Sequence, residues 1–288
     1  MKLFIVFLLL LFVSCKSTNI AFEFDNNVKS IPTVTISIPS FYDDSYIDMI
    51  FGIDTGCQRS CFYDYAAKKL FASEEDFDDF ISAACLQKGI SKEELLYKEL
   101  NLELYDVKCG KYTFPKVWFS NTADKANGLE GVLGYEAFKD LGVVLFDFKK
   151  NLLTIGKRKI KKNVLPMKED VFAIEFLEGT SKTVLLSIPI EIEGKTYDSV
   201  IDTGFSSDGI PSILVWDFAD FPETVTVKIG NIVYEKVEQV KFSDGECANQ
   251  LLKDNAVFLL KDKLFLGNAF FQNHRIQLDF ENMTFAMD

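Results

Sequence analysis

The tripeptide Asp-Thr-Gly occurs twice in this chain, at residues 54–56 and 202–204, each time directly after an apolar segment. Glycine permits a tight turn and the close approach of a second chain, and a threonine hydroxyl can brace that approach by hydrogen bonding. Two such loops facing each other would bring two carboxyl groups together. Like charges that close cannot both ionise, so the pair shares one proton and titrates as a unit.

A carboxyl pair of this kind can activate water for attack on an amide. The protonated member donates to the carbonyl oxygen while the ionised member removes a proton from water, so no covalent intermediate is needed. The candidate site consists of the catalytic residues Asp54 and Asp202 and the supporting loop residues Thr55, Gly56, Thr203 and Gly204.

The amino-acid composition excludes or disfavours several other kinds of functional site and partner. The chain has one histidine, His274, so zinc sites with two or three histidines cannot form, and a Ser-His-Asp or Cys-His site would have to use it. The six cysteines include no C-x-x-C pair. With 43 Asp plus Glu against 31 Lys plus Arg in 288 residues, the net charge of −12 disfavours a nucleic-acid partner. We expect carboxylate chemistry without a metal or a cofactor.

Four landmarks recur in the same order in the two halves and indicate an internal duplication. The heptad 33–39 matches 183–189 at five of seven positions, and Asp-Thr-Gly follows each. Farther along come Val-Leu-Gly at 132–134 and Phe-Leu-Gly at 265–267, each before a segment ending in Asp-Phe. A single Asp after a strand is commonly a turn residue. Two in matched contexts favour a paired site.

The elements that must position these loops are mostly strands, since Phe, Val, Ile and Thr occur in short runs broken by Gly, Asn and Asp. We expect one lobe over residues 31–160, a linker over 161–174 and a second lobe over 175–288. A helical insertion in the first lobe should begin at a capping box formed by Ser73 and Asp76 and should stop at Gly89.

The amino terminus is typical of an exported protein. Residues 1–14 hold a positive start and an apolar run too short to cross a ~30 Å hydrocarbon layer, as in a signal peptide. The following Cys15 resembles the lipidated cysteine of bacterial lipoproteins, and residues 15–30 are a predicted tether. The bilayer would then be a partner through the lipid anchor, and Lys16 favours the outer membrane. An ordinary signal peptide with an incidental cysteine is the alternative.

Together, the two Asp-Thr-Gly loops and the two apolar-apolar-Gly segments resemble those of aspartic peptidases, and most closely the retropepsin-like domains of bacterial proteins. In that family the second element reads Gly-Ile-Leu-Gly with Phe shortly after, a pattern that residues 131–138 and 264–271 follow. The resemblance covers residues 33–156 and 183–288. It implies an all-β fold with a closed barrel in each half, a monomer that acts as a built-in dimer, and a peptide or protein substrate.

The chain departs from the family pattern beside both loops. Pepsin-like motifs continue with Ser or Thr and retroviral ones with Ala, whereas Cys57 and Phe205 stand here. No glycine-rich flap is evident, and hairpins within 108–119 and 224–240 are the candidates. Endopeptidase activity is the favoured function. The alternative is a non-catalytic peptide- or glycan-binding envelope lipoprotein on a degenerate scaffold.

The cysteines allow two interpretations. Export permits disulfides, and a bridge from Cys57 or Cys61 to Cys85 or Cys109 would tie the helical insertion to the first loop. Alternatively, these residues are small buried hydrophobes.

Overall fold

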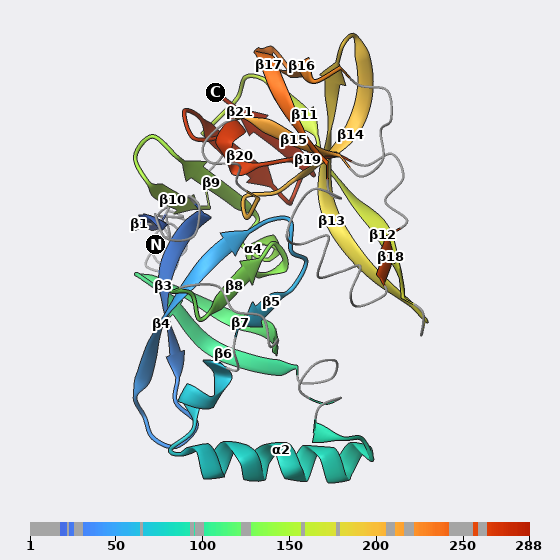
Figure 1. Ribbon diagram of the computed structural model, residues 1–288. Coiled ribbons are helices and arrows are strands. Elements are labelled where there is room, and N and C mark those ends of the chain that lie inside the picture. Colours follow the sequence, from blue (N-terminus) through green and yellow to red (C-terminus); the bar gives the residue numbers. More distant parts are fainter. Residues whose placement is uncertain are drawn as a thin grey trace, which may run out of the picture.

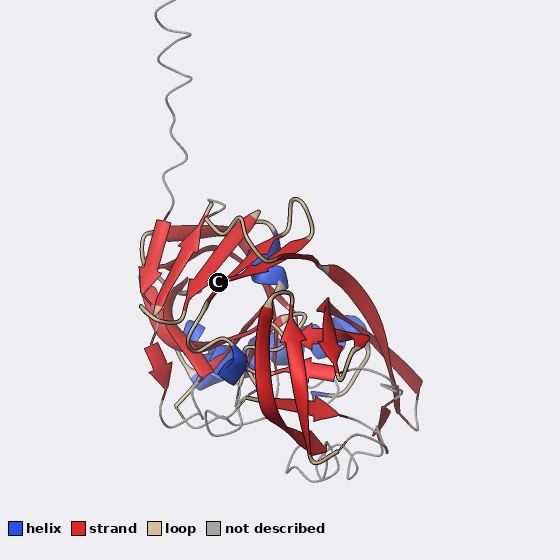
Figure 2. Ribbon diagram, turned by 90° about the horizontal axis from the view of Figure 1, so that it is seen from above, coloured by secondary structure: helices blue, strands red, loops and turns tan. Residues whose placement is uncertain are grey.

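The computed structural model describes residues 18–21, 23–25, 31–63, 66–92, 95, 101–121, 128–156, 159–176, 179–205, 211–215, 222–241, 256–258 and 264–288. The predicted signal peptide and Cys15 lie outside these ranges. Two β lobes are joined by a shared sheet (Figure 1), and strands predominate over helices (Figure 2). The predicted all-β, two-lobe class is confirmed. Among the helices in these ranges, none combines the length and apolarity needed to span a bilayer.

Lobe 1 is built around a closed ring of strands. Its sheet has the order β2-β3-β4-β8-β5-β7-β6, and β6 also pairs with β3, which closes the ring. The strands are β2 (Glu23–Asp25), β3 (Ile31–Pro39), β4 (Tyr46–Asp54), β5 (Ser60–Phe62), β6 (Leu102–Cys109), β7 (Tyr112–Asn121) and β8 (Gly131–Gly134). Inside it, the ring of Phe62 packs 4.8 Å from Phe119 and 5.6 Å from Phe51 between centroids.

Lobe 2 repeats this ring. Its order is β14-β19-β15-β17-β16-β13, and the pairing of β13 with β14 closes it. The strands are β12 (Lys168–Phe176), β13 (Gly179–Ile192), β14 (Lys195–Ile201), β15 (Ser212–Val215), β16 (Thr224–Ile229), β17 (Ile232–Lys241), β18 (Ala256–Phe258) and β19 (Leu264–Leu266). Parallel pairs fall at the same places, β4 with β8 and β14 with β19, then β5 with β7 and β15 with β17. The duplication therefore extends to topology.

A six-stranded antiparallel sheet joins the lobes and takes three strands from each half. Its order is β1 (Thr18–Ala21), β10 (Leu152–Ile155), β9 (Val143–Asp147), β20 (Arg275–Asp279), β21 (Thr284–Met287) and β11 (Val164–Pro166). The halves meet where β9 pairs with β20, with Leu145 opposite Gln277 at the centre.

Parts of the two predicted connecting segments form strands. Strands β1 and β2 lie within the predicted tether 15–30, and β11 with most of β12 lies within the predicted linker 161–174. Strands β1, β2 and β11 have only three or four residues each, too few to show a hydrophobic period. They form because the sheet edges offer unpaired backbone groups, and Ile20 of β1 is buried as a result.

The duplicated heptad also needs correction. Thr33 pairs with Gly52, two residues before Asp54, whereas the residue that pairs two before Asp202 is Ser187. Ser187 is thus the structural counterpart of Thr33, four residues beyond the Thr183 that the sequence match indicated. The other landmarks superpose in register, since β8 and β19 run parallel to β4 and β14 at equivalent positions.

The helices within the described residues are η1 (Ala66–Leu70), α2 (Glu74–Lys88), α4 (Glu136–Lys139) and η4 (Asn268–Phe270). The predicted caps of α2 are confirmed, because Ser73 Oγ accepts from Asp76 N at 3.1 Å and Gly89 ends the helix at φ 70°. Along the helix, the buried residues are Phe77 and Ile81.

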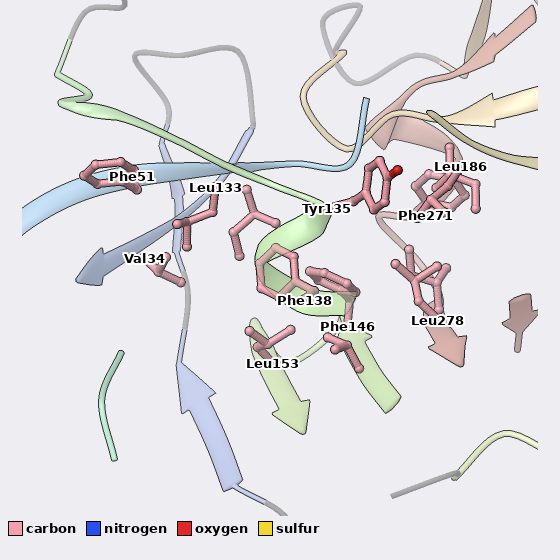
Figure 3. Packing of buried hydrophobic residues seen from close by; sticks show 14 of the residues in the cluster. Val34, Phe51, Leu133, Tyr135, Phe138, Phe146, Leu153, Leu186, Phe271 and Leu278 are labelled. Carbon is pink, nitrogen blue, oxygen red and sulfur yellow. The ribbon is translucent and has the colours of Figure 1, made fainter. Parts of the chain in front are cut away.

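One buried cluster runs through both lobes around α4. Figure 3 shows Tyr135 and Phe138 from the β8–α4 segment beside Phe146 of β9, with Leu186 and Phe271 from lobe 2 nearby. The Phe138 and Phe146 rings lie 6.1 Å apart between centroids. This continuous core holds the two lobes, and so their Asp-Thr-Gly loops, in a fixed relation.

Candidate active site

The two Asp-Thr-Gly loops face each other. Asp54 is the last residue of β4, and Asp202 directly follows β14. A Cβ placed on Gly56 would lie 2.5 Å from Asp202 Oδ2, and one on Gly204 would lie 2.5 Å from Asp54 Oδ2. Each glycine therefore packs against the carboxyl group of the other lobe, an approach that no residue with a side chain would allow. The structure brings the predicted aspartates together.

The two threonines brace this approach symmetrically. Thr55 Oγ1 donates to Ile201 O at 2.7 Å and accepts from Thr203 N at 3.1 Å. Thr203 Oγ1 donates to Ile53 O at 2.8 Å and accepts from Thr55 N at 3.0 Å. Both side chains are fully buried. Each hydroxyl thus crosses to the opposite lobe and satisfies buried backbone groups there.

Backbone N–H groups hold the carboxylates in place. Gly56 N donates to Asp54 Oδ1 at 2.8 Å. Asp202 Oδ1 accepts from Gly204 N at 2.9 Å and from Phe205 N at 2.8 Å. These short-range bonds fix each carboxyl in the turn that follows its strand.

The electrostatics of the pair are unequal. Burial, the charge of Asp54 and a hydrogen bond with Asp54 raise the pKa of Asp202 well above its ordinary value. Burial also raises the pKa of Asp54, opposed by the hydrogen bond from Asp202 and by backbone N–H donors, Gly56 first among them. These directions describe two buried carboxyls that share one proton and titrate as a pair.

The residues after each motif, Phe205 and Cys57, make different contacts. Phe205 contributes its N–H to Asp202, and a Cβ on Gly267 would lie 2.6 Å from its Cδ1, so the ring packs against Gly267. The Cys57 thiol donates to Arg59 O at 3.0 Å. Burial first, then the charge of Asp54, raises the pKa of this thiol well above its usual value. It remains protonated and is no candidate nucleophile.

The proposed disulfides do not form. Cys57, Cys85 and Cys109 are free thiols, so neither bridge from the first loop to the helical insertion exists. Cys109 is 1% exposed, and burial raises its pKa to about 12, which fits the alternative of a small buried hydrophobe.

Neither predicted flap hairpin lies over the carboxyl pair. The β16–β17 turn is fastened to the six-stranded sheet, because Asn163 Oδ1 accepts from Asn231 N at 2.7 Å and Asn163 Nδ2 donates to Met287 O at 3.2 Å. In lobe 1, Cys109 before the β6–β7 turn pairs with Ile36, which is opposite Met49. Met49 precedes the end of β4 by five residues, about 17 Å along a strand.

Polar side-chain contacts between the lobes were not predicted from the sequence. Tyr135, 1% exposed, donates through its hydroxyl to Glu169 Oε1 at 3.0 Å, and Lys139 Nζ reaches the same oxygen at 2.7 Å. Gln58 also joins the lobes, through contacts with Glu136 and Val184. No sequence motif marks these residues, since their partners are distant in the chain.

Comparison with known proteins supports the fold. No family model matches the sequence, and no curated protein matches it. Among solved structures, the aspartic proteinase from Irpex lacteus is similar with a TM-score of 0.50 and 12% identity, over 94% of this chain and 97% of that chain. At this identity the likeness shows the fold alone. The chain therefore has an aspartic-proteinase-like scaffold, with a carboxyl pair where the two lobes meet.

Proposed function

We propose that this protein is an aspartic endopeptidase that hydrolyses peptide bonds with a water molecule activated between Asp54 and Asp202. The observation that carries the proposal is the reciprocal packing of each Asp-Thr-Gly glycine against the opposite carboxyl group. The threonine brace and the aspartic-proteinase-like fold support it. Both carboxyls come from one chain, so the monomer is the active unit. The substrate is a peptide or a protein.

The reaction follows from the protonation of the pair. Ionised Asp54 takes a proton from water as the oxygen adds to the peptide carbonyl carbon, and Asp202 gives its proton to the carbonyl oxygen. A tetrahedral diol results. Asp54 then delivers its proton to the amide nitrogen, the C–N bond breaks, and Asp202 recovers a proton from a diol hydroxyl. The products are a carboxylic acid and an amine, and the pair returns to its starting state without metal or cofactor.

The same pair sets the proposed pH dependence. Activity requires one proton on the two carboxyls, so it falls at low pH when Asp54 is protonated and at high pH when Asp202 loses its proton. Because burial and the charge of Asp54 raise the pKa of Asp202, the upper limb extends above the ordinary range of an Asp. Activity should therefore persist into mildly acidic solution.

We also propose that the mature protein is held in the bacterial cell envelope by a lipid on Cys15. The apolar run that ends just before this cysteine and the polar segment after it support the proposal.

Digestion of a peptide library tests the activity directly. Wild type should cleave, whereas Asp54→Asn and Asp202→Asn should each lose at least about a thousandfold in kcat, since each removes one proton-transfer role. Asp279→Asn is the matched control, because Asp279 is a buried carboxyl in β20 that accepts from Asn282 and takes no part in the pair. It should cleave as wild type does.

Absence of cleavage by wild type between about pH 3 and 7, where such pairs titrate, together with failure to bind pepstatin, would overturn the endopeptidase proposal. The binding-module alternative would then be favoured, and retention of unmodified peptides or glycans by the protein would support it.

A further inference from the structure

The side chain of Gln58 bridges the two lobes. Its Oε1 accepts from Val184 N at 2.8 Å and contacts Thr183 Oγ1 at 3.3 Å, both on β13 of lobe 2. Its Nε2 donates to Glu136 Oε1 at 2.7 Å, at the start of α4 in lobe 1. The orientation of the amide is fixed by chemistry, because a backbone N–H needs an acceptor and a carboxylate needs a donor.

In lobe 1, Gln58 belongs to the turn that follows Asp54. The backbone of this turn is bonded to the β8–α4 segment, since Cys57 O accepts from Tyr135 N at 2.9 Å and Gln58 O accepts from Glu136 N at 3.2 Å. Gly134, just before this segment, lies opposite Asp54 in the pairing of β4 with β8. A movement of Gln58 is therefore transmitted to the chain beside Asp54.

In lobe 2, the contact falls on the strand beside Asp202. Strand β13 pairs with β14 from Ser187 opposite Val200 onward, and continuing that register places residue 185 opposite residue 202. Val184 therefore lies at the edge of β13 next to the Asp202 loop, just before β14 begins to cover that edge. Its N–H would otherwise be an unpaired donor on a strand edge, and the Gln58 amide satisfies it.

We propose that Gln58 is a positioning residue that sets the separation of the two carboxyl groups. This inference rests on the proposed function. The threonines hold the two loops together at their backbones, and Gln58 adds a second, off-centre connection that resists rotation of one lobe against the other. The interaction between the carboxyls varies inversely with their distance, so a small rotation changes how they share a proton.

Three substitutions separate the contacts. Gln58→Ala removes all of them, and Gln58→Met removes them while preserving volume, which keeps the test available if the alanine variant does not fold. Gln58→Glu keeps an acceptor for Val184 N but places a second carboxylate beside Glu136. It should behave as Gln58→Ala near pH 7 and recover toward wild type in acid, where one of the two carboxyls takes up a proton.

The measurements are kcat and KM against pH, and the titration of the paired carboxyls followed by 13C NMR of labelled Asp. For Gln58→Ala we expect kcat to fall about 10- to 100-fold with KM changed less than about threefold, as for a misplaced catalytic group. The upper apparent pKa of the pair should move down toward the ordinary Asp value. Lys139→Ala is the control, because it removes an exposed inter-lobe ion pair that contributes little to stability.

Wild-type values of both kcat and the pair titration in Gln58→Ala or Gln58→Met would overturn the positioning role, as would equal effects in Lys139→Ala. The NMR titration does not depend on cleavage. If wild type shows a raised upper pKa but cleaves nothing, the proposed function fails, and a shift of that pKa in the Gln58 variants still decides the positioning role.

Discussion

The threonine brace gives the sharpest test of how the two loops are held together. Thr203→Val replaces the hydroxyl by a methyl group of nearly the same size, so packing is preserved. It removes the partner of two fully buried backbone groups, Ile53 O at 2.8 Å and Thr55 N at 3.0 Å. Thr203→Ser does the opposite, since it keeps the hydroxyl and removes only the methyl group.

The two substitutions differ in expected magnitude. A buried backbone group left without a partner costs about 1–3 kcal/mol, so Thr203→Val should lower the free energy of unfolding by about 2–6 kcal/mol. The lost methyl in Thr203→Ser should cost about 1 kcal/mol. A domain is stable by only about 5–15 kcal/mol, so the valine variant should be severely weakened. By symmetry, Thr55→Val should behave in the same way, through Ile201 O and Thr203 N.

Equilibrium urea unfolding measures these values, with the slope compared between variants to confirm that the same transition is observed. A stabilising role for the Thr203 hydroxyl is excluded if Thr203→Val lies within about 1 kcal/mol of wild type, the range of an ordinary surface substitution. It is also excluded if Thr203→Ser is the less stable of the two. Either result would mean that the hydroxyl bonds across the lobes do not hold the loops together.

Three further predictions concern the pair, its glycines and the anchor. Because burial and Asp54 raise the pKa of Asp202, the folded state keeps a proton that the unfolded state releases above about pH 4. Stability should therefore fall by about 1.4 kcal/mol per pH unit as pH rises toward the folded pKa, and urea unfolding of Asp202→Asn should lack this slope. Gly204→Ala places a Cβ 2.5 Å from Asp54 Oδ2, so peptide cleavage should drop more than about 100-fold, whereas Gly52→Ala, with side-chain neighbours at 3.2 and 3.3 Å, should retain most activity. Cys15→Ala should move the protein from membrane to soluble fractions, and unchanged partitioning would contradict lipidation.

Local patterns were sufficient for the parts of this protein that depend on neighbours in sequence. The caps of α2 at Ser73 and Gly89 follow from side chains within one turn of the helix ends. The two Asp-Thr-Gly turns follow from a motif that occurs twice, each time after an apolar strand. One Asp-Thr-Gly tripeptide alone would say little. Because it occurs in both halves of the chain, the sequence indicated that the two loops face each other.

Other features of the protein could be assigned only from the tertiary structure. The heptad match was displaced by four residues because apolar β-branched runs resemble each other wherever they occur, and only strand pairing assigns their register. The β16–β17 hairpin, predicted as a flap, is bonded toward the six-stranded sheet through the contact of Asn163 with Asn231, and the β6–β7 hairpin lies beside β3. No local pattern reports which way a hairpin turns.

The sequence by itself determined that two aspartates in matched turns form the candidate site and that strands carry them. Tertiary structure decided how the halves are joined, with short strands such as β1 and β11 completing a shared sheet. It also decided that Gln58 reaches Val184 across the lobes. The physical reason is that backbone pairing at a sheet edge and a single amide contact depend on groups more than a hundred residues away, which leave no periodicity or motif in the chain.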